Sequence, residues 1–402
     1  MSPRLALLQP YPFQKLRELF AGLAPAAGLA HINLSIGEPK HPTPEFIKDA
    51  LVANFAGLSA YPATQGSDDL RRSISDWIAQ RYGIAAPNPA TEVLPVNGSR
   101  EALFAFAQAV INTGVAHQPV VLSPNPFYQI YEGAALLAGA EPWYVNCTAE
   151  TAFQPDWDSV PDEVWARTQL VYVCSPGNPT GAVAKLADWE RLFALSDRYG
   201  FVIASDECYS EIYFGDEKPL GGLEAAAKLG RSNERLVMFS SLSKRSNVPG
   251  LRSGFVAGDA KLLEQFLLYR TYHGCAMSPT VQAASAAAWR DEVHVADNRA
   301  QYTAKFAAVT AKLATVLDVS LPDAAFYLWA KVPGGDDLAF AKRLFSEAHI
   351  TVLPGSFLAR EAHGVNPGAG YIRIALVAPL AECVAGAERI VALCQADVAL
   401  SN

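Results

Sequence analysis

The chain lacks most of the features that mark a membrane protein, an exported protein or a nucleic-acid-binding protein. No segment approaches the ~20 uninterrupted apolar residues that a membrane-spanning helix requires, so we expect no membrane partner. The N-terminus shows no basic region followed by an apolar stretch, so we expect no export signal. The formal net charge is −8 and no basic stripe offsets it, so we expect no nucleic-acid partner.

Cysteine is also scarce. Six cysteines occur without any C-x-x-C spacing, at positions 147, 174, 208, 275, 383 and 394. Isolated cysteines of this kind predict a reduced, cytoplasmic protein without a structural zinc or other metal site.

Apolar residues, in contrast, are abundant enough for a large core. They make up 50% of the 402 residues, and this length exceeds the usual size of a single core. We expect an N-terminal segment over 1–45 that packs on the small domain and the site. A large domain over 46–290 and a small C-terminal domain over 291–402 would follow.

Apolar runs alternate with segments of helical periodicity through the expected large domain. The runs that predict buried strands lie at 119–123, 170–174, 201–205, 236–240 and 253–257. The segments that predict helices lie at 99–112, 186–199, 260–270 and 278–290. This alternation is typical of an α/β fold with a mostly parallel sheet and helical crossovers.

The last third of the chain predicts a smaller α+β domain. An alanine-rich stretch at 293–316 has a helical period and predicts a long helix that leads into this domain. The domain would contain a strand near 326–332, a helix over 337–348 and a strand around Arg373.

A turn after one predicted strand holds a lysine and an arginine. Lys244 follows the run 236–240 closely, and Arg252 comes eight residues later. Burial at a strand end lowers the pKa of an ammonium group, and a neutral amine can form a Schiff base with an aldehyde. The Arg252 guanidinium and the hydroxyls of Ser241 and Ser243 are suitable donors to a phosphate. An aldehyde and a phosphate in one small molecule indicate pyridoxal 5'-phosphate (PLP).

A second strand end supplies a carboxylate. Asp206 follows the run 201–205, where an unpaired carboxylate is costly to bury. In one interpretation it pairs with the protonated pyridine nitrogen of PLP, so that the ring can act as an electron sink. Tyr209 can then reach the phenolic oxygen of the ring. In the other interpretation Asp206 caps the N-terminus of a following helix.

A third strand end carries an amide. Asn178 follows the run 170–174 and precedes a proline, which favours an extended backbone and directs the side chain away from the strand. Such an amide can donate a hydrogen bond to the phenolic oxygen of PLP. Because ligands of open α/β sheets bind at the carboxyl ends of strands, we expect Asn178, Asp206 and Lys244 to lie together there.

These motifs resemble, in order and in spacing, those of the class I/II, fold-type I aminotransferases, and the resemblance covers nearly the whole chain. They are Asn178-Pro-Thr-Gly, Asp206-x-x-Tyr209, Ser241-x-Ser243-Lys244 and Arg252. The resemblance implies a PLP-dependent transaminase in which Lys244, Asp206 and Tyr209 act in catalysis.

Further matches to the family extend the implied cofactor site. Gly98, Ser99 and Arg100 open a helix whose first amides would bind the cofactor phosphate. Tyr128 would lie against the face of the ring. Tyr61 would reach the phosphate of a neighbouring subunit, which implies a homodimer with shared active sites.

The family resemblance also implies contacts to the substrate. Arg373, in Tyr-Ile-Arg-Ile-Ala, would clamp the α-carboxylate with two parallel hydrogen bonds. The backbone of Gly37 would approach the same carboxylate, and Asn178 would lie beside it. The implied substrates are small amino acids and 2-oxo acids.

Four longer stretches resemble the succinyldiaminopimelate transaminases within this family, at 33–44, 243–250, 272–275 and 353–358. This likeness implies transfer of an amino group from N-succinyl-LL-2,6-diaminopimelate to 2-oxoglutarate, in lysine and diaminopimelate biosynthesis. The candidates for contacts to the far end of such a substrate are Lys40, Arg100, Arg245 and Asn247. The residues by themselves predict only a PLP-dependent transaminase. An aspartate, aromatic or N-acetylornithine-type aminotransferase, or a PLP-dependent β-lyase, remains open.

Overall fold

The computed structural model describes residues 1–401 and is organised around a seven-stranded sheet. The strand order is β2-β8-β7-β6-β5-β3-β4, and all neighbours run parallel except β8, which is antiparallel to both β2 and β7. This confirms the predicted α/β fold with a mostly parallel sheet. The strands are β2 (Val93–Val96), β3 (Val120–Asn125), β4 (Glu141–Asn146), β5 (Thr168–Cys174), β6 (Val202–Asp206), β7 (Leu236–Ser241) and β8 (Gly254–Gly258).

The five predicted strands correspond to β3, β5, β6, β7 and β8, with ends that differ by one or two residues. The two strands that the sequence did not predict, β2 and β4, lie at the edges of the sheet. Most residues of β4 are only partly buried, and β2 has four residues with a proline among them. Neither strand therefore carries the long apolar run by which the central strands were recognised.

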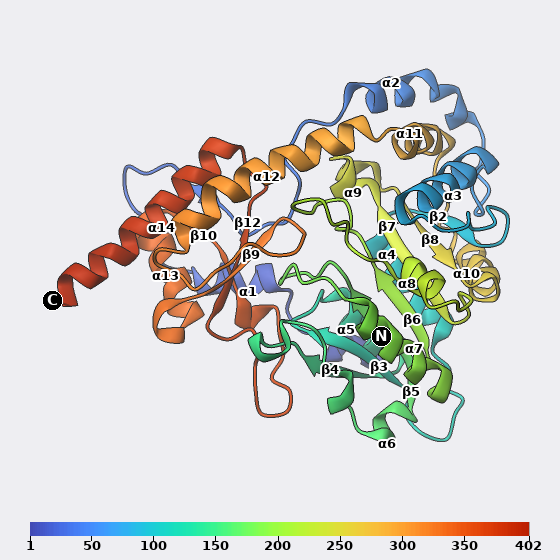
Figure 1. Ribbon diagram of the computed structural model, residues 1–402, viewed down its shortest axis with the longest axis horizontal. Helices are drawn as coiled ribbons and strands as arrows, with labels where there is room; N and C mark the ends of the chain where they lie inside the picture. Colours follow the sequence, from blue (N-terminus) through green and yellow to red (C-terminus); the bar gives the residue numbers. More distant parts are fainter. Residues whose placement is uncertain (402) are drawn as a thin grey trace.

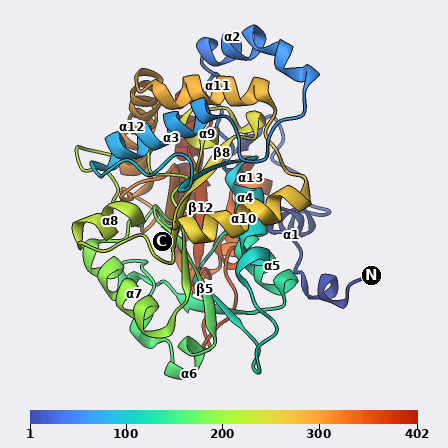
Figure 2. The same ribbon diagram turned by 90° about the vertical axis from the view of Figure 1, so that its right-hand side faces the viewer.

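Helices cover both faces of the sheet, which explains why the central strands are apolar throughout. Leu170 and Tyr172 of β5 pack in one core with α4, α5 and α10, whereas Val171 and Val173 pack in another with α3, α7, α8 and α11. Figure 2 shows these two groups of helices on opposite sides of the strands. The helices are α2 (Glu45–Ala53), α3 (Asp68–Tyr82), α4 (Ser99–Val110), α5 (Ile130–Ala138), α6 (Asp162–Trp165), α7 (Leu186–Tyr199), α8 (Gly222–Lys228), α9 (Leu242–Arg245), α10 (Ala260–His273) and α11 (Pro279–Arg290).

A third core lies beyond α12 (Val293–Leu313), the long helix that runs from the large domain to the smaller α+β part (Figure 1). Here β9, β12 and β11 form an antiparallel sheet, and β1 pairs in parallel with β10. Ile32 and Leu34 share this core, so the N-terminal segment packs on the small domain. The division at 45 and 290 stays a prediction. The remaining elements are α1 (Pro12–Leu19), β1 (Ile32–Asn33), β9 (Tyr327–Lys331), α13 (Asp337–Ala348), β10 (Ile350–Thr351), β11 (Leu353–Pro354), β12 (Tyr371–Ala375) and α14 (Leu380–Ser401).

In the part of the chain that the structure describes, no helix combines the length and the apolar character needed to cross a membrane.

Candidate active site

A cavity of about 550 Å³ lies where the carboxyl ends of β5, β6 and β7 meet β12 and the N-terminal segment. Twelve of the fourteen predicted site residues line it: Gly37, Ser99, Arg100, Tyr128, Asn178, Asp206, Tyr209, Ser241, Ser243, Lys244, Arg252 and Arg373. Its wall also includes residues that the sequence did not single out, among them Tyr11, Phe13, Glu38, Gln129 and Tyr327. The strand ends therefore meet as expected from the parallel sheet.

Lys244 lies in α9, directly after β7, and its amine faces this cavity. Burial lowers the pKa of the Lys244 ammonium, and the positive charges of Arg100 and Arg252 lower it further, against the opposing effects of Cys208 and Asp206. A larger share of the amine is therefore neutral near pH 7 than for an exposed lysine. This is the protonation state that attack on a carbonyl carbon requires.

Asp206 ends β6 and is only 4% exposed. Its Oδ2 accepts a hydrogen bond from the Tyr131 hydroxyl at 2.7 Å, and its Oδ1 accepts one from the Cys208 amide at 3.3 Å. Burial raises the pKa of Asp206, although both of these hydrogen bonds favour the carboxylate. No helix follows Asp206, because residues 208–211 form a turn, so the helix N-cap interpretation is wrong.

Tyr131 is a residue that reasoning from the sequence missed in this role. Its ring stacks on Tyr172 with centroids 4.5 Å apart and an interplanar angle of 13°, which holds its hydroxyl at hydrogen-bonding distance from Asp206. Tyr131 lies only three positions after Tyr128, which the sequence did single out. Its contact to a carboxylate 75 residues away carries no local signal.

Arg373 and Asn178 form a pair across the cavity. The Nη1 of Arg373 donates to the Asn178 side-chain oxygen at 2.9 Å, and its Nη2 donates to the Ser35 carbonyl at 2.7 Å. The guanidinium is 4% exposed, lies 4.3 Å from the centroid of the Tyr327 ring, and its Nε has no partner among the described residues. Because arginine can only donate, the amide NH₂ of Asn178 is left available for another acceptor.

Tyr209 bonds to a second tyrosine that the sequence did not reveal. Its hydroxyl lies 2.9 Å from the hydroxyl of Tyr327, and both side chains are buried. The backbone of Gly37 approaches the same place so closely that a Cβ there would collide with the Tyr327 hydroxyl. Glycine is therefore required at position 37 by the close approach of the backbone to this pair.

The N-terminus of α4 and Arg252 form a cradle for an anion. Gly98 precedes α4 with a φ of 90°, and no side chain caps the helix. A Cβ at Gly98 would collide with the Arg252 guanidinium, so that cation lies directly against the positive end of the helix. Two positive features in contact favour an anion between them, and Ser99, Ser241 and Ser243 add hydroxyl donors along the same wall. The donor set thus fits the phosphate of PLP.

Tyr128 lines the cavity and accepts a hydrogen bond at 2.6 Å from the Nε of Arg100. Gly98 contributes backbone beside the cavity but does not line it. Tyr61 is fully exposed and lies outside the cavity of its own chain. Its implied contact to a neighbouring subunit stays a prediction.

Two candidates for contacts to the far end of the substrate are wrong. Arg245 is 2% exposed and forms an ion pair with Glu292, and Asn247 is buried and donates to the side chain of Asn298. Neither side chain lines the cavity. The Arg245 guanidinium lies over the rings of Trp77 in α3 and Trp289 in α11, and Asn247 lies against α12. Lys40 is exposed and does not line the cavity, which leaves Arg100.

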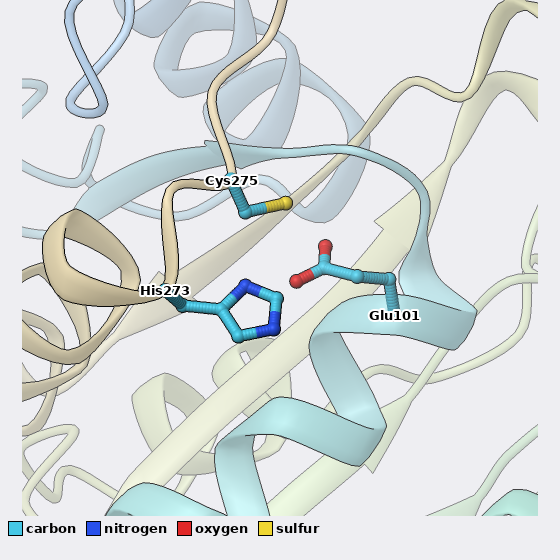
Figure 3. A group of neighbouring side chains, drawn as sticks. All are labelled: Glu101, His273 and Cys275. Carbon is cyan, nitrogen blue, oxygen red and sulfur yellow. The ribbon is translucent and has the colours of Figure 1, made fainter.

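A separate cluster brings together Glu101 of α4, His273 of α10 and Cys275 (Figure 3). Their potential ligand atoms all lie within 4.8 Å of one another. However, the buried guanidinium of Arg270 donates to Glu101 at 2.7 Å, and its charge opposes a cation at this place. We therefore interpret Glu101 as the partner of Arg270 in an ion pair that links α4 to α10, and not as a metal ligand.

Comparisons with known proteins define the class of protein to which this site belongs. The family model described as aminotransferase class I and II matches residues 30–390. The chain therefore belongs to this family, is an aminotransferase of fold type I, and depends on PLP.

Individual relatives agree with this assignment. An LL-diaminopimelate aminotransferase from Syntrophobacter fumaroxidans is 34% identical over 93% of this chain and 94% of its own length. A crystal structure of an aminotransferase from Neisseria meningitidis has a TM-score of 0.96 and 58% identity, over 98% of this chain and 100% of the other. A structure from Thermus thermophilus, described as a probable N-succinyldiaminopimelate aminotransferase, has a TM-score of 0.82 and 28% identity, over 95% and 98%.

Proposed function

We propose that the protein transfers an amino group between N-succinyl-LL-2,6-diaminopimelate and 2-oxoglutarate, giving N-succinyl-2-amino-6-oxopimelate and glutamate. The reaction would serve lysine and diaminopimelate biosynthesis in the cytoplasm. The motif likeness at 33–44 and 353–358 supports the succinylated substrate. The names of the relatives support a substrate built on diaminopimelate.

The observation that carries this proposal is the charge and size of the cavity. A volume of about 550 Å³ is within the usual range for a site that holds a cofactor and a long substrate. Three arginines line the cavity. Arg252 would bind the cofactor phosphate and Arg373 the substrate α-carboxylate, so Arg100 is the guanidinium that remains for the far end of the substrate. It can pair with one of the carboxylates at the far end of a succinylated substrate.

The roles of the residues follow from their positions. The bound cofactor supplies an electron sink for the bond that is broken at the substrate α-carbon. Lys244 would hold the aldehyde carbon and then move the α-proton, and Asp206 would keep the pyridine nitrogen protonated. Asn178 and Tyr209 would donate to the phenolic oxygen.

Other groups would orient the cofactor and the substrate. Tyr128 would lie against the ring, and the cradle formed by the α4 N-terminus and Arg252 would hold the phosphate. Arg373, already fixed by Asn178 and Ser35, would bind the α-carboxylate of both substrates in turn.

A second candidate substrate is unmodified LL-diaminopimelate. Glu38 lines the cavity and forms no hydrogen bond or ion pair among the described residues. A carboxylate at that place can recognise the far ammonium group of LL-diaminopimelate, which is an amide in the succinylated compound. Several relatives are named for this activity.

One kinetic comparison tests the proposal. The kcat/KM values for N-succinyl-LL-diaminopimelate, LL-diaminopimelate, N-acetylornithine and aspartate are measured, each with 2-oxoglutarate. We expect the succinylated compound to be preferred, and Arg100→Gln to reduce that preference more than Glu38→Gln does. A preference for LL-diaminopimelate that Glu38→Gln abolishes supports the second candidate. A preference for aspartate contradicts both.

We further propose a homodimer with shared active sites. Tyr61 and Tyr272 are almost fully exposed, and Leu58, Phe55 and Leu268 are also exposed, although large apolar side chains are usually buried. If Tyr61 completes the site of a partner, a mixture of Tyr61→Phe and Lys244→Ala forms hybrids with one intact site. The mixture should then exceed the summed activities of its parents, whereas a fully active monomer in sedimentation contradicts the proposal.

A further inference from the structure

His41 lies two residues beyond the stretch 36–39 that lines the cavity, and it contacts two polar side chains of α12. Its Nδ1 is 2.7 Å from the Oδ1 of Asn298, and its Nε2 is 2.6 Å from the Nζ of Lys305. The imidazole also packs on Tyr302 with ring centroids 4.6 Å apart. Asn298 and Lys305 are each only 2% exposed.

The protonation state of the His41 imidazole follows from the hydrogen bonds that Asn298 makes. The Nδ2 of Asn298 donates to the backbone carbonyls of Lys244 and Arg245, at 3.1 and 3.3 Å, so its Oδ1 faces His41 and must accept. The Nδ1 of His41 therefore carries a proton. Its Nε2 then accepts from Lys305 when the imidazole is neutral, and burial favours that form because it lowers the pKa of His41.

Asn298 donates hydrogen bonds to carbonyl groups of α9 that find no partner within that helix. The helix α9 has only four residues, and the last carbonyls of so short a helix have no partner within it. Two of these carbonyls, those of Lys244 and Arg245, accept hydrogen bonds from the side-chain amide of Asn298. The protonated Nδ1 of His41 and the amide of Asn247 both donate to the Oδ1 of Asn298, and together they hold its Nδ2 toward the end of α9.

The other end of the group reaches the strand that carries the carboxylate-binding arginine. Lys305 also donates to the carbonyl of Val377 at 3.2 Å, two residues after the end of β12. Arg373 lies within β12, and its guanidinium is held by the carbonyl of Ser35 in the N-terminal segment. Hydrogen bonds thus run without interruption from the backbone near Arg373, through Lys305, His41 and Asn298, to the backbone of Lys244.

We propose that His41 and Lys305 are positioning residues, which hold the cavity wall at 36–39 and the end of β12 in a fixed place relative to Lys244. The chain of hydrogen bonds from Val377 to the Lys244 carbonyl keeps a substrate that is bound at Arg373 at a constant distance from the Lys244 amine. This rests on the roles of Lys244 and Arg373 given under the proposed function, but not on the identity of the long substrate.

The cost of burying Lys305 distinguishes positioning from simple packing. No carboxylate forms an ion pair with Lys305 among the described residues, and both of its hydrogen-bond partners are neutral. The pKa of Lys305 is lowered to about 8, mainly by burial, with Cys383 opposing the shift and Lys40 adding to it. A buried cation without an anion destabilises a fold, so packing alone would be served as well or better by an apolar side chain.

The test uses the holoenzyme with glutamate, because glutamate is a substrate in each of the candidate transaminase activities. Lys305→Met removes the donor while keeping length, and His41→Phe keeps the ring on Tyr302 while removing both hydrogen bonds. Lys312→Met, at an exposed position of the same helix, is the matched control. The rate of a single turnover with glutamate, the midpoint of the pH titration of the visible cofactor band, and the unfolding temperature are compared.

We expect Lys305→Met and His41→Phe each to slow the single turnover at least tenfold and to shift the midpoint of the visible titration. The unfolding temperature of Lys305→Met should be unchanged or higher. The double variant should be no slower than the slower single variant, because both belong to one chain of bonds. Lys305→Gln, which keeps an amide donor, should recover part of the rate.

Single-turnover rates within twofold of the wild type in both variants, or losses that multiply in the double variant, would overturn the proposal. A fall in rate that accompanies an equal loss of folded protein in Lys305→Met and Lys305→Gln would also overturn it. Failure of the proposed function is distinguishable, because the wild type would then react with glutamate and fail with the diaminopimelate substrates.

Discussion

Arg373 donates from Nη1 to the side-chain oxygen of Asn178 at 2.9 Å, although the two residues are 195 positions apart in the chain. The bond joins β12 of the small domain to the turn after β5 of the large domain. It fixes the orientation of the asparagine amide, whose NH₂ is then the end available to a ligand. One hydrogen bond thereby couples the residue proposed to bind the substrate carboxylate to the residue proposed to donate to the cofactor ring.

Lys244→Ala should abolish the visible absorption of the bound cofactor and reduce turnover by several orders of magnitude. The variant removes the amine that we propose bonds to the aldehyde carbon and moves the α-proton. Absorption spectra and steady-state rates with glutamate measure both effects. Lys261→Ala, an exposed lysine, is the control, and near-normal turnover in Lys244→Ala would disprove the assignment.

Tyr131→Phe should raise the pKa of Asp206 further, because the hydroxyl now stabilises the carboxylate. A carboxyl group that ionises less readily would pair less well with the protonated pyridine nitrogen of the proposed site. The loss of one hydrogen bond of about 1 kcal/mol predicts a roughly fivefold fall in kcat. Asp206→Ala should lower kcat far more. Tyr199→Phe removes a comparable bond to the exposed Asp162 and should leave kcat unchanged. An unaltered kcat in Tyr131→Phe argues against this support of Asp206.

Gly37→Ala should impair catalysis by displacing Tyr327, since the new methyl group would collide with the Tyr327 hydroxyl. The double variant Gly37→Ala/Tyr327→Phe removes the colliding oxygen and should recover part of the activity. Gly133→Ala, a helical glycine with room for a Cβ, is the matched control. If Tyr327→Phe gives no recovery, the collision is not the cause of the loss.

Arg373→Lys should reduce kcat/KM for glutamate by about 10- to 100-fold, because lysine cannot pair with a carboxylate in the same two-bond geometry. The same substitution at the exposed Arg198 should have no effect. Initial rates over a range of glutamate concentrations test this. The loss should be equal for every α-amino acid substrate, and a loss confined to the long substrate would place Arg373 at its far end instead.

The buried Lys305 predicts how stability changes with pH. Its pKa in the folded protein is about 8, below the ordinary value of 10.5, so the unfolded state binds more protons between these two values. The free energy of unfolding of the wild type should therefore rise with pH across this window relative to Lys305→Met. Urea unfolding of both proteins at pH 7 and pH 10 measures this difference. A constant difference would show that Lys305 is not titrated as the structure implies.

Local patterns in the sequence predicted the parts of the site that depend on strand ends. Asn178, Asp206 and Lys244 each follow a continuous apolar run, and a parallel sheet brings the carboxyl ends of such runs together. The edge strands β2 and β4 were not predicted, because β4 is only partly buried and β2 is short and contains a proline, so neither has a long continuous apolar run. The prediction for Arg245 and Asn247 was wrong because each is buried against distant segments, Arg245 against α3 and α11 and Asn247 against α12.

The sequence by itself thus determined five of the seven strands, the polar residues that follow three of them and the chemistry that these residues can perform, because these depend on period, burial and neighbouring residues. Only the tertiary structure decided which groups complete them. Tyr131 beside Asp206, Tyr327 beside Tyr209 and Lys305 behind His41 are contacts between distant segments. Such contacts are selected by the packing of helices and strands in three dimensions, and no local spacing in the chain encodes them.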